Sequence, residues 1–197
     1  LLVLGAYLYP GALLLLSTQV AAAPHDRANS AIDASRGALG REVPDLAFTD
    51  TTGRTVRLGD YKGKPLLITL IYTGCADVCP TMIQNLHPAV LAAQKALGAD
   101  SFSVVTVGFD VGADTPERMQ KFASAQGVDL PNWKFLSTDE ATVARLADAV
   151  GFSIFSRAGG FDHLAQITVV DAGGKIYQQV YGALFDAPLV VEPLKDL

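Results

Sequence analysis

The feature that most constrains the fold is a continuous apolar run, residues 66–72 (LLITLIY), which leads directly into a turn containing Cys75 and Cys79. A short run rich in β-branched and aromatic residues is typical of a strand buried on both faces. After this turn, apolar residues recur at helical spacing over residues 80–97, with Pro80 in the first turn. The sequence therefore predicts a unit of strand, cysteine turn and helix, with a kink or interruption at Pro88.

The rest of the chain continues this alternation of strands and helices. We expect a second buried strand, two further helices that end near glycines, the second opened by a capping box at 137–140, and hairpins on both sides of this region. The expected segments are 46–50 paired with 55–58, 102–109, 114–127, 137–151, and 164–171 paired with 175–181. This order predicts an α/β domain with a mixed central sheet flanked by helices and an N-terminal hairpin extension.

The first 42 residues differ from this pattern. Residues 1–16 carry no charge and are followed by small residues, which is typical of a signal peptide or a membrane anchor. The chain starts at Leu1 without a basic region, so we expect the beginning of the gene product to be missing. We assign 1–23 to the signal or anchor, 24–42 to a tether, and 43–197 to the folded domain. This arrangement predicts an exported protein, in the periplasm or an equivalent space, tethered to the membrane.

Composition excludes several functional classes. The chain has 15 Lys and Arg against 20 Asp and Glu, a net charge of −5, which argues against a nucleic-acid binder. Hydrophobic residues make up 50% and charged residues 18%, so a real core is expected. With two cysteines and three histidines, any metal or redox chemistry must depend on Cys75, Cys79 and few other residues.

The two cysteines have the spacing of a chemical site. They lie where a strand passes into a helix, close to the positive end of the helix dipole, which favours the thiolate. Three intervening residues allow the sulfurs either to form a disulfide or to hold one soft ion. Thiolates suit Cu(I), and the absence of a second cysteine pair counts against structural zinc. A structural disulfide in an exported protein is the simplest alternative.

Other candidate residues depend on where the fold places them. His163 precedes the late hairpin and could approach the cysteines, although an ordinary core or surface histidine is the commoner case. Asp110 follows the second buried strand, where ligand crevices form in α/β sheets, but it could equally cap a turn. Asp77, between the cysteines, could orient the turn or simply be solvated.

At this point the residues resemble a known family. The stretch 72–81 (YTGCADVCPT) is similar to the signature of the SCO/SenC proteins, together with the GKP at 63–65, the DTPE at 114–117 and the pair Asp162-His163. The resemblance covers about residues 40–181. The chain departs from the usual pattern at Ala76, Val111 and Leu164, and none of these changes removes a ligand.

The resemblance implies a thioredoxin-like fold and a copper-delivery function. It implies that Cys75, Cys79 and His163 bind one copper ion, as Cu(I) and possibly as Cu(II), for delivery to the dinuclear copper site of cytochrome c oxidase subunit II or to another copper or thiol acceptor. Asp77, Asp110 and Asp162 would lie around these ligands. The alternative is a thiol-disulfide oxidoreductase in which Cys75 and Cys79 form a redox disulfide. A peroxiredoxin-like peroxidase and a purely structural domain are weaker alternatives.

Overall fold

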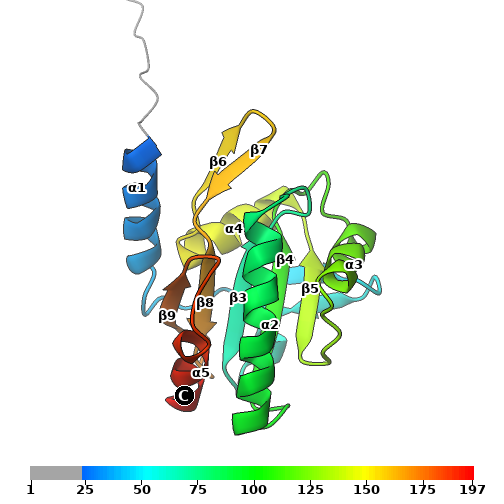
Figure 1. Cartoon of the computed structure of the whole chain (residues 1–197), viewed down its shortest axis with the longest axis vertical. Helices are drawn as coiled ribbons and strands as arrows, with labels where there is room; N and C mark the ends of the chain where they lie inside the picture. The colour runs from blue at the N-terminus through cyan, green and yellow to red at the C-terminus, as the bar shows by residue number, and fades with distance from the viewer. Residues whose placement is uncertain (1–23) are drawn as a thin grey trace, which may run out of the picture.

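A seven-stranded mixed sheet forms the centre of the computed structural model, which describes residues 24–197 (Figure 1). The order across the sheet is β2-β1-β5-β4-β3-β8-β9, in which β3, β4 and β5 are parallel and the other neighbours are antiparallel. The strands are β1 (Ala47–Asp50), β2 (Thr55–Arg57), β3 (Leu66–Ile71), β4 (Ser103–Gly108), β5 (Trp133–Ser137), β8 (Gln166–Val170) and β9 (Ile176–Tyr181).

The central strands are apolar because they are covered on both faces. Every residue of β3, β4 and β8 is buried. Two of their few polar side chains, Thr69 and Thr106, are paired within the sheet. The Thr69 hydroxyl donates to the Thr106 hydroxyl at 2.9 Å, and the same oxygen accepts the indole N–H of Trp133 at 2.9 Å. The cost of burying these groups is therefore offset by hydrogen bonds.

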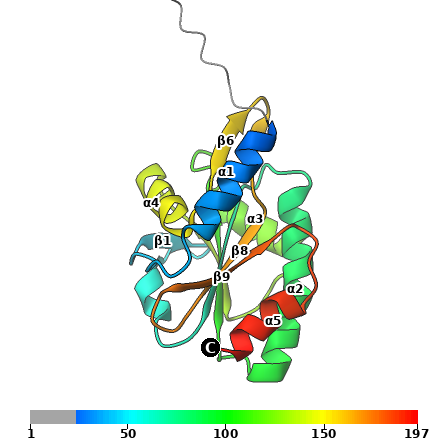
Figure 2. The ribbon, with the colours of Figure 1, turned by 90° about the vertical axis from the view of Figure 1, so that its left-hand side faces the viewer.

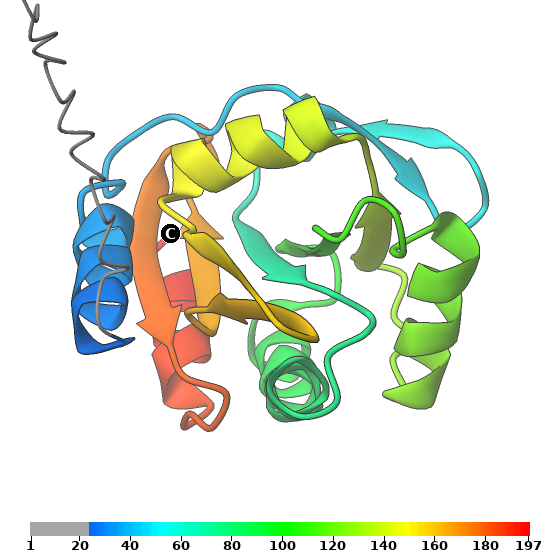
Figure 3. The same cartoon turned by 90° about the horizontal axis from the view of Figure 1, so that it is seen from above.

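Helices cover both faces of this sheet. Figure 3 shows α2 and α5 on one face and α4 on the opposite face. The helices are α1 (Pro24–Arg36), α2 (Val78–Leu97), α3 (Pro116–Ala125), α4 (Glu140–Val150) and α5 (Pro188–Lys195), with a 3-10 turn at Leu58–Tyr61. The mixed sheet flanked by helices and extended by the β1–β2 hairpin is the thioredoxin-like architecture that the resemblance implied.

Several local predictions need correction. Helix α2 continues through Pro88 and is not interrupted there. Helix α4 is capped by Asp139, whose side chain accepts the N–H of Thr142 at 2.8 Å, whereas Ser137 belongs to β5. The prediction missed β5 and a second, two-stranded sheet made of β6 (Ile154–Arg157) and β7 (Gly160–His163). This hairpin projects from the body of the domain (Figure 1).

The segment expected to be a tether, residues 24–42, is not irregular. It contains α1, which lies beside β9 (Figures 1 and 3) and runs up to β6 (Figure 2). Ser35 is fully buried and its hydroxyl accepts the Tyr181 hydroxyl proton at 3.0 Å. A Cβ on Gly151 would lie 2.3 Å from the Ala34 carbonyl oxygen, so α1 packs at a distance that only glycine allows. The weak helical periodicity hid this helix because few of its side chains are buried.

The expected signal or anchor, residues 1–23, lies outside the described residues. Within residues 24–197, the structure contains no helix with the length and apolar character needed to cross a membrane.

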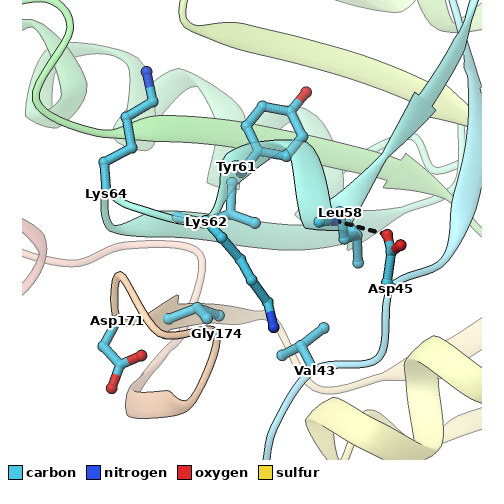
Figure 4. A pocket seen from close by; sticks show the side chains of 11 residues that line it. Val43, Asp45, Leu58, Tyr61, Lys62, Lys64, Asp171 and Gly174 are labelled. Carbon is cyan, nitrogen blue, oxygen red and sulfur yellow. Dashed lines mark hydrogen bonds between the residues drawn. The ribbon is translucent and has the colours of Figure 1, made fainter.

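A small hollow lies at the amino end of β3, away from the cysteine turn (Figure 4). It is lined by Leu58, Tyr61 and Lys62 among others, and Lys62 pairs with Glu42 at 2.8 Å. Its volume of about 20 Å³ has room for about one water molecule. This hollow is therefore too small for a ligand site.

Candidate metal centre

Cys75 lies in the turn between β3 and α2 and is partly exposed. Burial by itself raises the pKa of the Cys75 thiol, but the N–H groups of Cys79 and Asp77 and the Tyr72 hydroxyl outweigh this effect. The pKa of Cys75 therefore lies below its ordinary value. The Cys79 N–H donates to the Cys75 sulfur at 3.3 Å, as expected where a thiolate faces the first turn of a helix.

Cys79 occupies the first turn of α2 and is fully buried. Burial raises the pKa of its thiol far above the usual range, and the neighbouring Cys75 and the Asp114 carboxylate add to the shift. Both cysteines are free thiols in the structure. The pair is therefore asymmetric, with one accessible sulfur that ionises readily and one buried sulfur that holds its proton.

His163 ends β7 and is brought to Cys79 across 84 residues of sequence. Its Nε2 lies 3.7 Å from the Cys79 sulfur. Its Nδ1 lies 3.2 Å from the Leu164 carbonyl oxygen, which can only accept, so Nδ1 carries the proton and the lone pair of Nε2 faces the sulfur. Burial lowers the pKa of His163, partly offset by the Leu164 carbonyl and Asp162, so the neutral imidazole needed for metal ligation is favoured.

Aromatic rings surround the His163 imidazole. The rings of Tyr72, Phe109 and Phe152 lie 6.0, 5.3 and 5.4 Å from it, centroid to centroid. These rings limit both the orientation of the imidazole and the access of water to it. The two thiols supply soft sulfur ligands, and the fixed neutral imidazole supplies a nitrogen ligand of intermediate softness.

The three side chains share one hollow. Cys75 and His163 line a cavity of about 240 Å³ together with Tyr72 and Phe161, and Cys79 lies beneath it. Metal bonds to sulfur and nitrogen are about 2.3 and 2.0–2.1 Å for zinc, so a sulfur ligand and a nitrogen ligand of one ion lie at most about 4.4 Å apart. The 3.7 Å between Cys79 and His163 fits within that limit. Within residues 24–197 no three His, Cys, Asp or Glu side chains already converge as a finished metal site.

The buried carboxylate nearest the cysteine turn is Asp114, which the sequence analysis treated only as part of a helix start. It is 2% exposed and accepts three hydrogen bonds, from the Thr73 N–H at 2.8 Å, the Thr73 hydroxyl at 2.7 Å and the Asp110 N–H at 2.9 Å. Burial raises the pKa of Asp114 despite these bonds. Asp114 therefore anchors the loop just before Cys75 to the loop after β4.

Of the three carboxylates predicted to surround the site, Asp77 and Asp162 line the same hollow as Cys75 and His163. Asp110 contributes its backbone, which accepts the N–H groups of Ala113 and Asp114, and this is the turn role considered as its alternative. Asp77 is exposed, and its backbone N–H is directed at Cys75. Asp162 is exposed and pairs with Arg157 at 2.9 Å on the rim of the cavity. An acidic residue near the carboxyl end of a buried strand was the one sequence signal that could also have marked Asp114.

Comparison with known proteins identifies the family. The sequence model of SCO1/SenC matches residues 37–196. The chain belongs to the SCO1/SenC family. A curated relative of this SCO1/SenC protein, the SCO1 protein homolog of Bacillus subtilis (strain 168), is 27% identical over 150 residues, which are 73% of this chain and 76% of the relative.

Solved structures of the family have the same fold. ScoI of Bradyrhizobium japonicum, solved with copper bound, is 27% identical, with a TM-score of 0.66 over 80% of this chain and 98% of that one. BsSco, described as having a disulfide switch and as a member of the Sco family of cytochrome c oxidase assembly proteins, shares the fold at 23% identity, with a TM-score of 0.67 over 80% of this chain and 94% of that one. These likenesses agree with the thioredoxin-like architecture described above.

Proposed function

We propose that this protein binds one copper ion and acts in the assembly of cytochrome c oxidase. Cys75, Cys79 and His163 would be the ligands. The observation that carries the proposal is the 3.7 Å approach of the His163 Nε2 to the Cys79 sulfur in a hollow that Cys75 also lines. Two sulfurs and one imidazole form a donor set that suits Cu(I), and a low coordination number leaves room for an incoming ligand. Membership of the SCO1/SenC family and the copper-bound relative support the choice of metal.

The copper ion is cargo in this proposal. The half-exposed Cys75 and the imidazole face the hollow, whereas Cys79 is buried, so an acceptor would reach the ion from the side of Cys75 and His163. The acceptor would be the dinuclear copper site of cytochrome c oxidase subunit II. The uncharged segment 1–16 supports export and membrane tethering, which would place the domain in the periplasm or an equivalent space beside such a partner.

The test is an anaerobic Cu(I) titration of the reduced chain against a competing chelator. One tightly held copper ion per chain is expected, with clear weakening in His163→Ala. His87→Ala is the matched control, since His87 is also half-buried and packs edge-on against an aromatic ring, that of Trp133, at 6.2 Å. Equal copper retention by the wild type and His163→Ala would remove His163 from the ligand set. Transfer is then tested by mixing the loaded chain with the copper domain of subunit II and following the spectrum of the dinuclear site.

The asymmetry of the cysteines favours one second candidate, a thiol-disulfide oxidoreductase. The Cys75 thiolate would attack a partner disulfide, and the Cys79 thiol, once deprotonated, would displace the reduced partner and close the Cys75–Cys79 disulfide. This reaction needs no imidazole ligand. Reduction of a model disulfide that survives His163→Ala, in a protein that retains no copper beyond a generic dithiol, would favour this candidate over the copper carrier.

A further inference from the structure

Tyr72, the residue after β3, contacts all three proposed copper ligands. Its hydroxyl faces the Cys75 sulfur, and its backbone N–H faces the Cys79 sulfur. Its ring meets the His163 ring edge-on at 6.0 Å. The side chain is 5% exposed, so these contacts are sheltered from water.

The same hydroxyl also reaches the hairpin that carries His163. It faces the backbone of Phe161, two residues before His163 on β7. The approach is close, because a Cβ on Gly160 would lie 2.9 Å from the Tyr72 hydroxyl oxygen. The Tyr72 and Phe161 rings also pack edge to face at 5.3 Å. The Tyr72 hydroxyl oxygen therefore lies between the cysteine turn and the β6–β7 hairpin.

This position matters because the hairpin has few directional contacts on the cysteine side, among them the 3.7 Å approach of the His163 Nε2 to the Cys79 sulfur. In the described part of the chain, β6 and β7 pair with each other and not with the seven-stranded sheet. An isolated two-stranded hairpin is marginally stable at best. The Arg157–Asp162 ion pair lies within the hairpin, and the Arg27 guanidinium contacts the Phe155 ring at 5.7 Å from the side of α1. The aromatic contacts of Phe109 with the hairpin are apolar and fix no direction.

We propose that the Tyr72 hydroxyl holds the β6–β7 hairpin against the cysteine turn and is the positioning residue that sets where His163 lies relative to Cys75 and Cys79. The effect on the hairpin is a property of the metal-free chain. The effect on copper rests on the proposed function.

The first experiment measures the hairpin without copper. In the reduced chain, Tyr72→Phe removes one oxygen atom and keeps the ring. The loss of one hydrogen bond is expected to speed amide exchange at Phe161 about three- to tenfold, while exchange in β3 and β4 stays unchanged. Tyr181→Phe is the matched control, since it removes a hydroxyl bonded to Ser35 and should leave Phe161 as in the wild type.

A second pair of variants tests the same contact from the hairpin. Gly160→Ala places a methyl group against the Tyr72 hydroxyl, whereas Gly159→Ala has nothing within 4 Å, and both glycines have positive φ. Faster exchange at Phe161 is expected in Gly160→Ala beyond any change in Gly159→Ala. This pair decides the matter if Tyr72→Phe does not fold.

Copper binding distinguishes the positioning of His163 from a general loss of structure. Tyr72→Phe is expected to retain Cu(I) about three- to tenfold less tightly and to shift the thiolate-to-Cu(II) absorption band, with Tyr181→Phe unchanged. Unchanged exchange at Phe161 in Tyr72→Phe and in Gly160→Ala would overturn the inference. Faster exchange with an unaltered copper spectrum would overturn the positioning of His163. Faster exchange in a chain whose wild type holds no copper would leave the role of Tyr72 in the hairpin standing and overturn the proposed function.

Discussion

Replacing Asp114 with alanine should destabilise the domain because it leaves three donors without their acceptor. The Thr73 N–H, the Thr73 hydroxyl and the Asp110 N–H all donate to this carboxylate at 2.7–2.9 Å. Hydrogen bonds to charged groups contribute about 1.5–3 kcal/mol each, so the gross loss is roughly 5–9 kcal/mol.

Two effects reduce that gross loss. The raised pKa of Asp114 shows that burial of the charge is not fully offset in the folded state, and removing the carboxylate relieves that cost. Asp114 also lines an open hollow of about 520 Å³, from which water can solvate the released donors. We therefore expect a net loss of about 2–4 kcal/mol in the free energy of unfolding, equivalent to a fall of about 4–16 °C in Tm.

The assay is urea unfolding of the reduced, metal-free chain at pH 7. Asp171→Ala is the matched control, because Asp171 also accepts two backbone N–H groups, from Gly173 and Lys175, but in an exposed turn. Its loss should cost less than about 1 kcal/mol because water replaces the carboxylate. The reasoning is refuted if Asp114→Ala unfolds within about 0.5 kcal/mol of the wild type, or no more easily than Asp171→Ala.

Three further predictions follow from the described contacts. Burial lowers the pKa of His163 from 6.5, so the neutral imidazole contributes to the free energy of unfolding above pH 6.5, and this contribution is lost as pH falls through the folded pKa. Unfolding of the metal-free chain measured against pH should show this loss, whereas the His163→Leu variant should not show it. Cys75, half-exposed and with a lowered pKa, should react with iodoacetamide at least about tenfold faster than the buried Cys79, and comparable rates measured by mass spectrometry would contradict the assigned asymmetry. Thr106→Val leaves the buried indole N–H of Trp133 unpaired and should cost about 1–3 kcal/mol in urea unfolding, less in a Trp133→Phe background.

Much of the fold was predictable because its signals are local. The apolar runs at β3 and β4, the helical spacing after Cys79 and the turn at 172–174 each follow from residues close in sequence, and the structure confirms these elements. Strand β5 was missed in part because its last residue, Ser137, was assigned to the capping box of the following helix. Helix α1 was missed because its mean hydropathy is low, with Ala31 and Ser35 among the few residues it buries.

The candidate site likewise combines residues that lie close in sequence with residues that only the tertiary structure brings together. Cys75 and Cys79 are four residues apart, so the sequence alone determines that they share one turn at the start of a helix. The roles of His163, Asp114 and Tyr72 were decided by the tertiary structure. His163 reaches Cys79 only because the β6–β7 hairpin turns back over the carboxyl end of the sheet, and Asp114 meets Thr73 only because β3 and β4 are parallel neighbours.

The physical reason is the range of the interactions. Periodicity and helix capping act over a few residues, so they can be read directly from the order of the amino acids. Contacts across 41 or 84 residues depend on the order of strands in the sheet and on how the loops close, and no short pattern encodes them. The sequence by itself determined the thiol pair and the strand and helix that carry it; the assembled sheet decided which imidazole, which carboxylate and which hydroxyl surround that pair.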